Sequence, residues 1–200
     1  MFILISERMQ KQIDFIVAID QLKEITRQNI VIGSKRNEND AEHSWHLAVM
    51  AMLLSEYAAE KDLDVLRVIK MVLIHDLVEI DAGDTYCYDE KGYEDKDERE
   101  QKAADRLFNF LPADQAKEMM ELWREFEEMK TPEAKFAASL DRFQPLLLNF
   151  NTGGFTWKRP EATSEKVFKR NDVAKENAPE IYAYAKAIIE DSIKRGILKE

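Results

Sequence analysis

A few histidine and aspartate residues stand out because they lie among apolar neighbours, where a charged side chain is costly to bury. Asp76 directly follows His75 in one strongly apolar segment, His43 begins a second, and Asp141 lies in a third. Neutral imidazole nitrogens and carboxylate oxygens both bind divalent first-row metal ions, with bonds of roughly 2.0 to 2.2 Å for zinc. A histidine–aspartate pair alone is common by chance, but four such groups could meet between packed helices and hold a metal ion.

The segments around the histidines are predicted to be helices. Apolar residues recur at helical spacing over residues 7–26, and an irregular loop over residues 29–39 follows. Asn39 or Asp40 is suited to cap a second helix, which is nearly all apolar and therefore buried. Residues 64–80 form an equally apolar helix. Two buried helices are thus expected to carry all three histidines.

The second half of the chain has helical periodicity as well. Thr131 is suited to cap a helix with Pro132 at its first position, and this helix carries Asp141. Further helices are expected after an acidic, aromatic loop that starts near residue 81 and ends in a helix before Pro112, and over residues 112–130, 163–176 and 179–195. No strands of consequence, repeats or linkers are evident. The sequence predicts one all-α, compact multi-helix domain over residues 1–200, with the motifs in about 8–150 and the C-terminal helices at about 163–196 packed on that core.

Composition and charge narrow the class of partner. The formal net charge of −10 disfavours nucleic acid, because affinity there comes from Lys and Arg. A bound cation and one or two arginines can still attract a small phosphorylated ligand. The start of the chain has no basic region and no cleavage site, and no apolar run approaches the ~18 residues of a membrane span. We therefore expect a cytoplasmic protein without a membrane partner, and the lone Cys87 cannot form an intramolecular disulfide.

The order of the motifs resembles a known family. The segments AEHSW around His43, LIHDLVEIDAGD around His75 and Asp76, and ASLDR around Asp141 are similar to the H…HD…D motifs of HD-domain phosphohydrolases. The resemblance spans about residues 8–150. It implies a helical HD-domain bundle in which His43, His75, Asp76 and Asp141 hold a divalent metal ion.

Within that superfamily the chain most resembles the compact 5′-deoxynucleotidases, which remove phosphate from nucleoside monophosphates. The resemblance implies that Glu79 orients or deprotonates the attacking water and that Asp84 is a substrate-site carboxylate. Arg27, expected near the end of the first helix, matches a phosphate-contacting arginine, although Gln28 stands where an aromatic residue is expected. Helical spacing also places Glu79 on one face with the His75 and Asp76 pair.

The number of histidines bears on the number of metal ions. Binuclear HD phosphodiesterases and di-iron oxygenases use further histidines, whereas this chain has only His43, His46 and His75. One metal ion is therefore favoured, and its identity among Mn, Co, Fe, Zn and Mg is left open by the residue types. His46 lies one turn from His43 and is expected to pack or to support the site from outside it.

Simpler interpretations exist for several of these residues. Glu79 could pair with a base, and Asp84 could be a turn residue after Gly83. The basic residues outside the motifs, Lys35, Arg36, Lys158 and Arg159, are expected on the solvated surface. The acidic segment 89–100 is expected to be a solvated face, with a lid over the site as the alternative.

The leading hypothesis is therefore an enzyme that hydrolyses nucleoside 5′-monophosphates, with a possible deoxy preference. A di- or triphosphate hydrolase, including one acting on guanosine alarmones, would use the same four ligands and differs in the product released. A regulatory module that binds metal or nucleotide without turnover is the non-enzymatic alternative, although it would not need the full ligand set. The apolar helices and the resemblance are also consistent with a homodimer.

Overall fold

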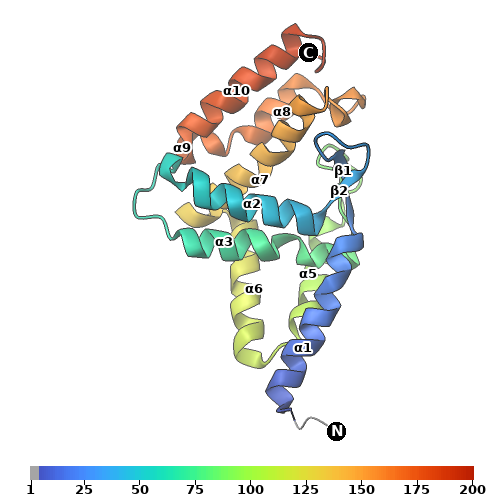
Figure 1. Cartoon of the computed structure of the whole chain (residues 1–200), viewed down its shortest axis with the longest axis vertical. Coiled ribbons are helices and arrows are strands. Elements are labelled where there is room, and N and C mark those ends of the chain that lie inside the picture. The colour runs from blue at the N-terminus through green and yellow to red at the C-terminus, as the bar shows by residue number, and fades with distance from the viewer. Residues whose placement is uncertain (1–4) are drawn as a thin grey trace.

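The computed structural model describes residues 5–200 and is built almost entirely of helices (Figure 1). The prediction about a signal peptide rests mainly on the first residues of the chain, and residues 1–4 lie outside the described part. Within residues 5–200, no helix is both long enough and apolar enough to cross a membrane. The first half of the chain contains α1 (Glu7–Ile19), η1 (Asp20–Glu24), β1 (Thr26–Ile30), β2 (Asn37–Asn39), α2 (Asp40–Leu54), η2 (Ser55–Tyr57), α3 (Val65–Ile74), η3 (His75–Val78) and α4 (Glu79–Ala82).

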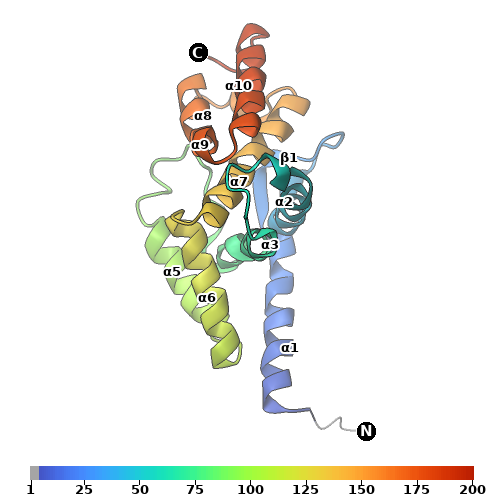
Figure 2. The same ribbon diagram turned by 90° about the vertical axis from the view of Figure 1, so that its left-hand side faces the viewer.

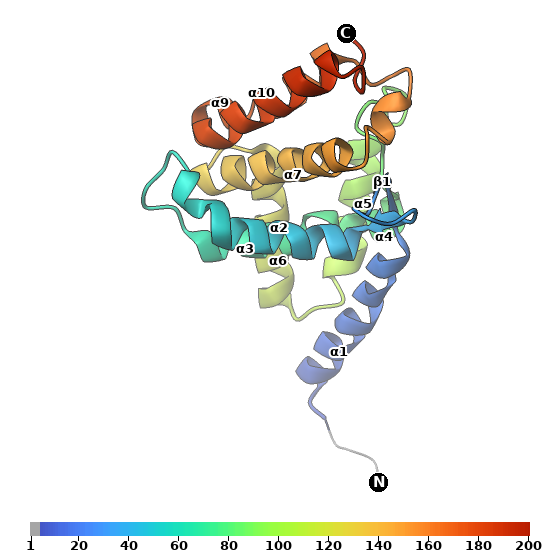
Figure 3. The same ribbon diagram turned by 45° about the horizontal axis from the view of Figure 1, so that its top comes forward.

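The second half supplies a helical hairpin, the long α7 and a C-terminal cover. Figure 2 shows α5 and α6 side by side, and Figure 3 shows α7 between the α2–α3 pair and α10. The elements are α5 (Lys96–Phe108), α6 (Ala113–Glu128), α7 (Pro132–Asn151), η4 (Thr156–Lys158), α8 (Ser164–Asn171), α9 (Ala174–Asn177) and α10 (Pro179–Lys194). The all-α prediction is confirmed, and α7 is the element against which both halves pack.

The helices that carry the site begin at well-defined caps. Asn39 accepts a hydrogen bond from the backbone N–H of Glu42, and the Glu42 side chain accepts one from the backbone N–H of Asn39, so α2 starts with a capping box. Thr131 caps α7 in the predicted way, with Pro132 in the first turn. Each cap fixes the residue at which its helix starts and hence the direction of its buried face.

The predicted helix over residues 64–80 is wrong in one respect, because it is not continuous. It ends as an α-helix at Ile74, becomes the 3₁₀ turn η3, and resumes as the short α4. His75 and Asp76 therefore open a tighter turn, where 3.0 rather than 3.6 residues complete a turn. A 3₁₀ turn inside a helical segment changes where successive side chains point, and here it does so at the metal motif.

The first helix is also shorter than predicted, and the expectation of no strands was incomplete. It ends at Ile19, and Arg27 lies on β1, which pairs antiparallel with β2 with Thr26 opposite Asn39. The β-branched residues Ile25, Thr26 and Ile30 favour this extended backbone over a further helical turn. Arg27 thus comes from a strand beside the start of α2.

The C-terminal segment follows the prediction more closely. The predicted helix over residues 163–176 is divided into α8 and α9, because α8 ends at Asn171. The last helix, α10, matches its predicted span within one residue at its end, and Pro179 occupies its first position. Gly196 follows with a positive φ of 67°, which suits a residue without a side chain after a helix.

Candidate metal centre

Two buried histidines on neighbouring helices, His43 and His75, both have their Nε2 atoms directed toward the same position. His43 on α2 has its Nδ1 3.1 Å from Gln144 Oε1, and His75 at the end of α3 has its Nδ1 3.0 Å from the carbonyl oxygen of Val72. Because both partners are oxygen acceptors, each Nδ1 carries the proton and donates it. The Nε2 lone pair of each ring is therefore free to bind a cation.

Two aspartates complete this group. Asp141 Oδ1 on α7 lies 3.0 Å from His43 Nε2 and 3.7 Å from His75 Nε2. Asp76 contributes Oδ1 at 3.1 Å from His75 Nε2 and Oδ2 at 3.9 Å from His43 Nε2. The His75 Nε2 atom is buried and has no hydrogen-bond partner among residues 5–200.

The donor set fits a metal ion. Unprotonated ring nitrogens and carboxylate oxygens that face each other at these distances repel unless a cation or a proton lies between them. Nitrogen and carboxylate oxygen are suitable ligands for a divalent first-row ion, and the atoms of His43, His75 and Asp141 all lie within 4.8 Å of one another. The structure thus brings the four side chains singled out by the sequence close together, with Asp76 nearest to His75.

The ionisation of these groups reflects their burial and their mutual charge. Burial lowers the pKa of His43 to about 4, helped by the positive charge of Arg27. Burial acts in the same direction on His75, but the charges of Asp76 and Asp141 outweigh it and raise its pKa to about 8. For Asp141, burial is opposed by hydrogen bonding with the two histidines, and the net effect holds its pKa well below the usual range. In the absence of metal, a proton on His75 supplies part of the missing positive charge.

A second group of acids lies beside the first. One carboxylate oxygen each of Asp40, Glu79 and Asp84 lies within 4.8 Å of the others. Asp40 Oδ2 and Glu79 Oε2 are buried without a hydrogen-bond partner among the described residues. Burial raises the pKa of Asp40 to about 7, and burial together with the charges of Asp76 and Asp40 raises the pKa of Glu79 well above its usual range. Such a cluster of carboxylates also has ligands that suit a divalent cation.

Arg27 provides the counter-charge on this side. Its Nη1 donates to Asp76 Oδ2 at 2.7 Å and to Asp40 Oδ1 at 3.2 Å, and its Nε lies 4.0 Å from Glu38 Oε2. The side chain is 11% exposed. Arg27 therefore binds the carboxylates directly and also lines the cavity beside them.

The sequence did not reveal a polar network in which Gln144 contacts His43 on the side of its Nδ1. Gln144 is completely buried on α7, accepts from His43 Nδ1, donates to Glu38 Oε1 at 2.6 Å and contacts His46 Nδ1 at 3.2 Å. His46 contacts Gln144 and is not part of the group formed by His43, His75 and Asp141. Gln144 stands one turn after Asp141, and this spacing on a buried helix was the signal that could have indicated it.

A cavity of about 270 Å³ opens beside the two clusters. His75, Asp76, Glu79, Asp84 and Asp141 all line it. The loop between α4 and α5 adds the aromatic residues Tyr86, Tyr88 and Tyr93, and α7 and α8 add Arg142 and Arg170. The acidic segment after residue 89 contributes Lys96, Asp97 and Glu100 to the lining, with Lys96 Nζ 2.6 Å from Glu100 Oε1. The metal group therefore adjoins a space bounded by both acids and bases.

Comparison with known proteins agrees with this arrangement. A model of the HD-domain family matches residues 19–182, which include all the motif residues. The crystal structure of a "predicted metal-dependent phosphohydrolase" from Magnetospirillum magnetotacticum MS-1 is 49% identical, covers 100% of both chains and superposes with a TM-score of 0.94.

Two curated relatives carry a more specific name. The 5′-deoxynucleotidase HDDC2 of Xenopus laevis is 31% identical over 180 residues, which is 90% of this chain and 86% of that protein. The human 5′-deoxynucleotidase HDDC2 is 34% identical over 136 residues, and this match covers 68% of the present chain and 65% of the human one. The match thus spans slightly less than two thirds of the human relative. By the family model and by these relatives, the chain belongs to the HD-domain family.

Proposed function

We propose that this protein is a metal-dependent phosphohydrolase that converts nucleoside 5′-monophosphates, preferably deoxy forms, to nucleoside and inorganic phosphate. The observation that carries the proposal is the convergence of His43, His75, Asp76 and Asp141 beside a cavity that is also lined by Glu79, whose Oε2 has no hydrogen-bond partner in the described part of the chain. Relatives named 5′-deoxynucleotidase support the choice of substrate.

His43, His75, Asp76 and Asp141 would hold one divalent ion, which would neutralise phosphate charge and make a bound water more acidic. The proton on each Nδ1 keeps the opposite nitrogen of His43 and His75 turned toward the ion. The ligand set accepts Mn, Co, Fe, Zn or Mg. The nearby acids Asp40, Glu79 and Asp84 offer a further group of oxygen ligands.

Glu79 is proposed as the general base. Its buried Oε2 has no hydrogen-bond partner among residues 5–200, and Glu79 lines the cavity, so this oxygen can take a proton from the attacking water. Burial and the charges of Asp76 and Asp40 raise the pKa of Glu79, and the positive charge of Arg27 opposes them. A divalent ion held beside Glu79 would lower this pKa and favour the carboxylate. The water oxygen then bonds to phosphorus, the bond from phosphorus to the 5′ oxygen breaks, and the 5′ oxygen takes up a proton from solvent.

Arg27 and Asp84 are proposed to contact the substrate. Both line the cavity, Arg27 next to Asp76 and Asp84 at the turn after α4. Arg27 could donate a hydrogen bond to a phosphate oxygen, and Asp84 could accept one from a sugar hydroxyl. Asp84 is only partly buried, so a ligand in the cavity can reach it.

A substrate screen tests the proposed activity. Metal-free protein is reloaded with each of the five metals and incubated with ribo and deoxy monophosphates, nucleoside di- and triphosphates and a guanosine alarmone. Release of orthophosphate from monophosphates, dependent on metal, is the expected result. Pyrophosphate or triphosphate release would favour the polyphosphate alternative, and no turnover on any substrate with any metal would favour a binding module.

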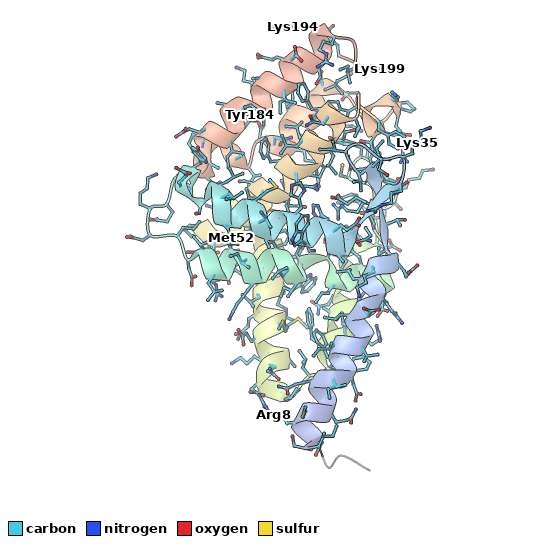
Figure 4. All side chains as sticks on the ribbon, in the orientation of Figure 1. Arg8, Lys35, Met52, Tyr184, Lys194 and Lys199 are labelled. Atoms are coloured by element: carbon cyan, nitrogen blue, oxygen red, sulfur yellow. The ribbon has the colours of Figure 1, made fainter. Side chains whose placement is uncertain are left out.

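We also propose that the chain forms a homodimer through the outer faces of α2 and α3. Trp45 and Met52 on α2, and Leu66 and Leu73 on α3, are exposed apolar pairs seven residues apart, so each pair lies on one face of its helix. Figure 4 shows Met52 among the side chains of these packed helices. Sedimentation equilibrium should give a dimer that Met52→Glu with Leu73→Glu dissociates, and a monomer at all concentrations of the unmodified protein would rule the dimer out.

A further inference from the structure

Two arginines at the edge of the cavity have one carboxylate oxygen between them. Arg142 on α7 has its Nη1 3.2 Å from Asp141 Oδ2, and Arg170 on α8 has its Nη2 3.9 Å from the same oxygen. Their side chains are mostly buried, with 18% and 24% exposed. Among residues 5–200, the guanidinium of Arg170 has no hydrogen-bond partner. Arg170 also lines the cavity, where a ligand could reach its guanidinium.

The remaining contacts do not compensate the two positive charges. Arg142 also donates to the carbonyl oxygen of Ala138 at 3.1 Å, and its Nη2 lies 3.4 Å from the sulfur of Met129, which is a weak acceptor. The other oxygen of Asp141 faces the histidines, 3.0 Å from His43 Nε2. Glu127 acts on the charge of Arg142, and Asp84 interacts with that of Arg170. Among residues 5–200, however, Asp141 is the carboxylate within ion-pair distance of both guanidiniums. Two guanidiniums that have left bulk water and share this one close partner favour an added anion.

Positive charge continues outward from the arginines. Arg142 and Arg170 also line a second depression of about 860 Å³, so they separate it from the metal cavity. Two of its lysines are paired, Lys166 with Glu90 at 3.0 Å and Lys175 with Asp172 at 2.8 Å. Its charged lining is basic overall, with Lys135, Arg142, Lys166, Lys169, Arg170 and Lys175 against Glu90, Asp172 and Glu176. In a chain of net charge −10, such a local field draws anions toward the arginines.

We propose that Arg142 and Arg170 form a phosphate-binding pair that holds the phosphate group of the substrate and then the orthophosphate product. The planar guanidinium donors match phosphate oxygens in geometry and charge. The role of the pair in turnover rests on the proposed function, whereas its affinity for phosphate does not. The pair is separate from Arg27, whose Nη1 already donates to Asp76 and Asp40.

Binding to zinc-loaded protein tests the pair directly. Arg142→Gln and Arg170→Gln should each weaken the Kd for orthophosphate and for deoxyadenosine 5′-monophosphate by about 10- to 100-fold, the typical effect of losing a charged hydrogen bond. Deoxyadenosine, which lacks the phosphate, should bind equally to all variants. Arg195→Gln, directly after α10, is the matched control, because Arg195 is exposed and its ion pair is with Asp191, which belongs to neither acid cluster. Phosphate affinity equal to that of the unmodified protein in both variants would overturn the proposal.

A measurement on the unmodified protein avoids any effect of the substitutions on folding or metal content. In ¹⁵N spectra of the arginine side chains, orthophosphate should shift the Nε–H signals of Arg142 and Arg170 but not that of Arg195. Unshifted signals of the pair together with normal turnover would remove the pair and leave the proposed function. Shifted signals in a protein that hydrolyses no monophosphate would support the pair and remove the proposed function.

Discussion

The two sides of the cavity have opposite excess charges. On the inner side a single guanidinium, that of Arg27, faces the carboxylates of Glu38, Asp40 and Asp76. On the outer side two guanidiniums, those of Arg142 and Arg170, face one oxygen of Asp141. Excess negative charge on one side suits a cation, and excess positive charge on the other suits an anion. A metal ion and a phosphate group placed side by side would balance both.

Asp141 belongs to both sides, so its removal should have the largest effect. Asp141→Ala takes away one oxygen from the metal group and the carboxylate that lies within ion-pair distance of both arginines. We expect metal occupancy to collapse and phosphate release to vanish with it. Elemental analysis of the purified variant, with the exposed Asp191→Ala as control, measures this. Full occupancy with intact activity would remove Asp141 from the metal group.

A substitution at Gln144 tests whether this residue holds His43 in its metal-binding tautomer and orientation. Gln144→Leu removes the acceptor for His43 Nδ1 and leaves Glu38 without its amide donor, so His43 is no longer fixed in the metal-binding tautomer. Loss of such a support typically weakens metal affinity by about 10- to 100-fold. The metal Kd and the ¹⁵N shifts of the His43 ring report it, with Gln10→Leu on the exposed face of α1 as control. An unchanged Kd and unchanged ring shifts would make Gln144 a packing residue.

The metal affinity of the inner side should depend on pH, because protons and the metal ion compete for the same groups. The pKa values of about 8 for His75 and about 7 for Asp40 mean that both groups hold protons in the metal-free protein at slightly acidic pH. Metal must displace these protons, so its affinity should rise from pH 6 to 8, by about tenfold per proton displaced and pH unit, and then level off. His43, with a pKa of about 4, is neutral throughout this range.

Stability links to the same groups with a defined sign. The raised pKa of His75 stabilises the metal-free fold below about pH 6.5, and this contribution is lost as pH rises toward 8. The raised pKa of Asp40 acts in the same sense, with its contribution lost by about pH 7. The increase in Tm on adding metal should therefore be larger at pH 8 than at pH 6.5. A constant increase across this range would contradict the assigned groups.

The smallest effect is expected for a substitution at Asp84, which should change substrate preference rather than metal binding. Asp84→Asn keeps the size of the side chain but weakens it as an acceptor for a sugar hydroxyl. The ratio of kcat/KM for paired ribo and deoxy monophosphates should change by about 2- to 10-fold, with little change in metal content. If the ratio stays constant, Asp84 is a turn residue after Gly83.

The sequence was sufficient to identify ionisable residues that lie in apolar segments. Ionisable groups in apolar helices have few reasons to be there, so His43, His75, Asp76 and Asp141 could be singled out before their positions were known. Helix caps at Asn39 and Thr131 could likewise be predicted, because they depend on local hydrogen bonds.

Other features depend on contacts between distant segments. The strand that carries Arg27 is fixed by pairing with β2, and helical spacing of the residues before it wrongly extended the first helix. Arg142 and Arg170 are ordinary basic residues in the sequence, and only the packing of α8 beside α7 places them at one oxygen. Gln144 gains its role from a tertiary contact with His43 across 101 residues of chain.

The most direct test of the central claim, a metal-dependent hydrolysis in which Glu79 is the base, separates binding from chemistry. Glu79→Ala leaves the atoms of His43, His75, Asp76 and Asp141 in place, so metal occupancy and the Kd for a deoxynucleoside monophosphate should change little. Removal of a general base typically lowers kcat by about 100- to 10,000-fold, or roughly 3 to 5 kcal/mol of transition-state stabilisation. We predict this loss with metal retained. Loss of metal in proportion to activity, or a nearly normal kcat, would contradict the role of Glu79.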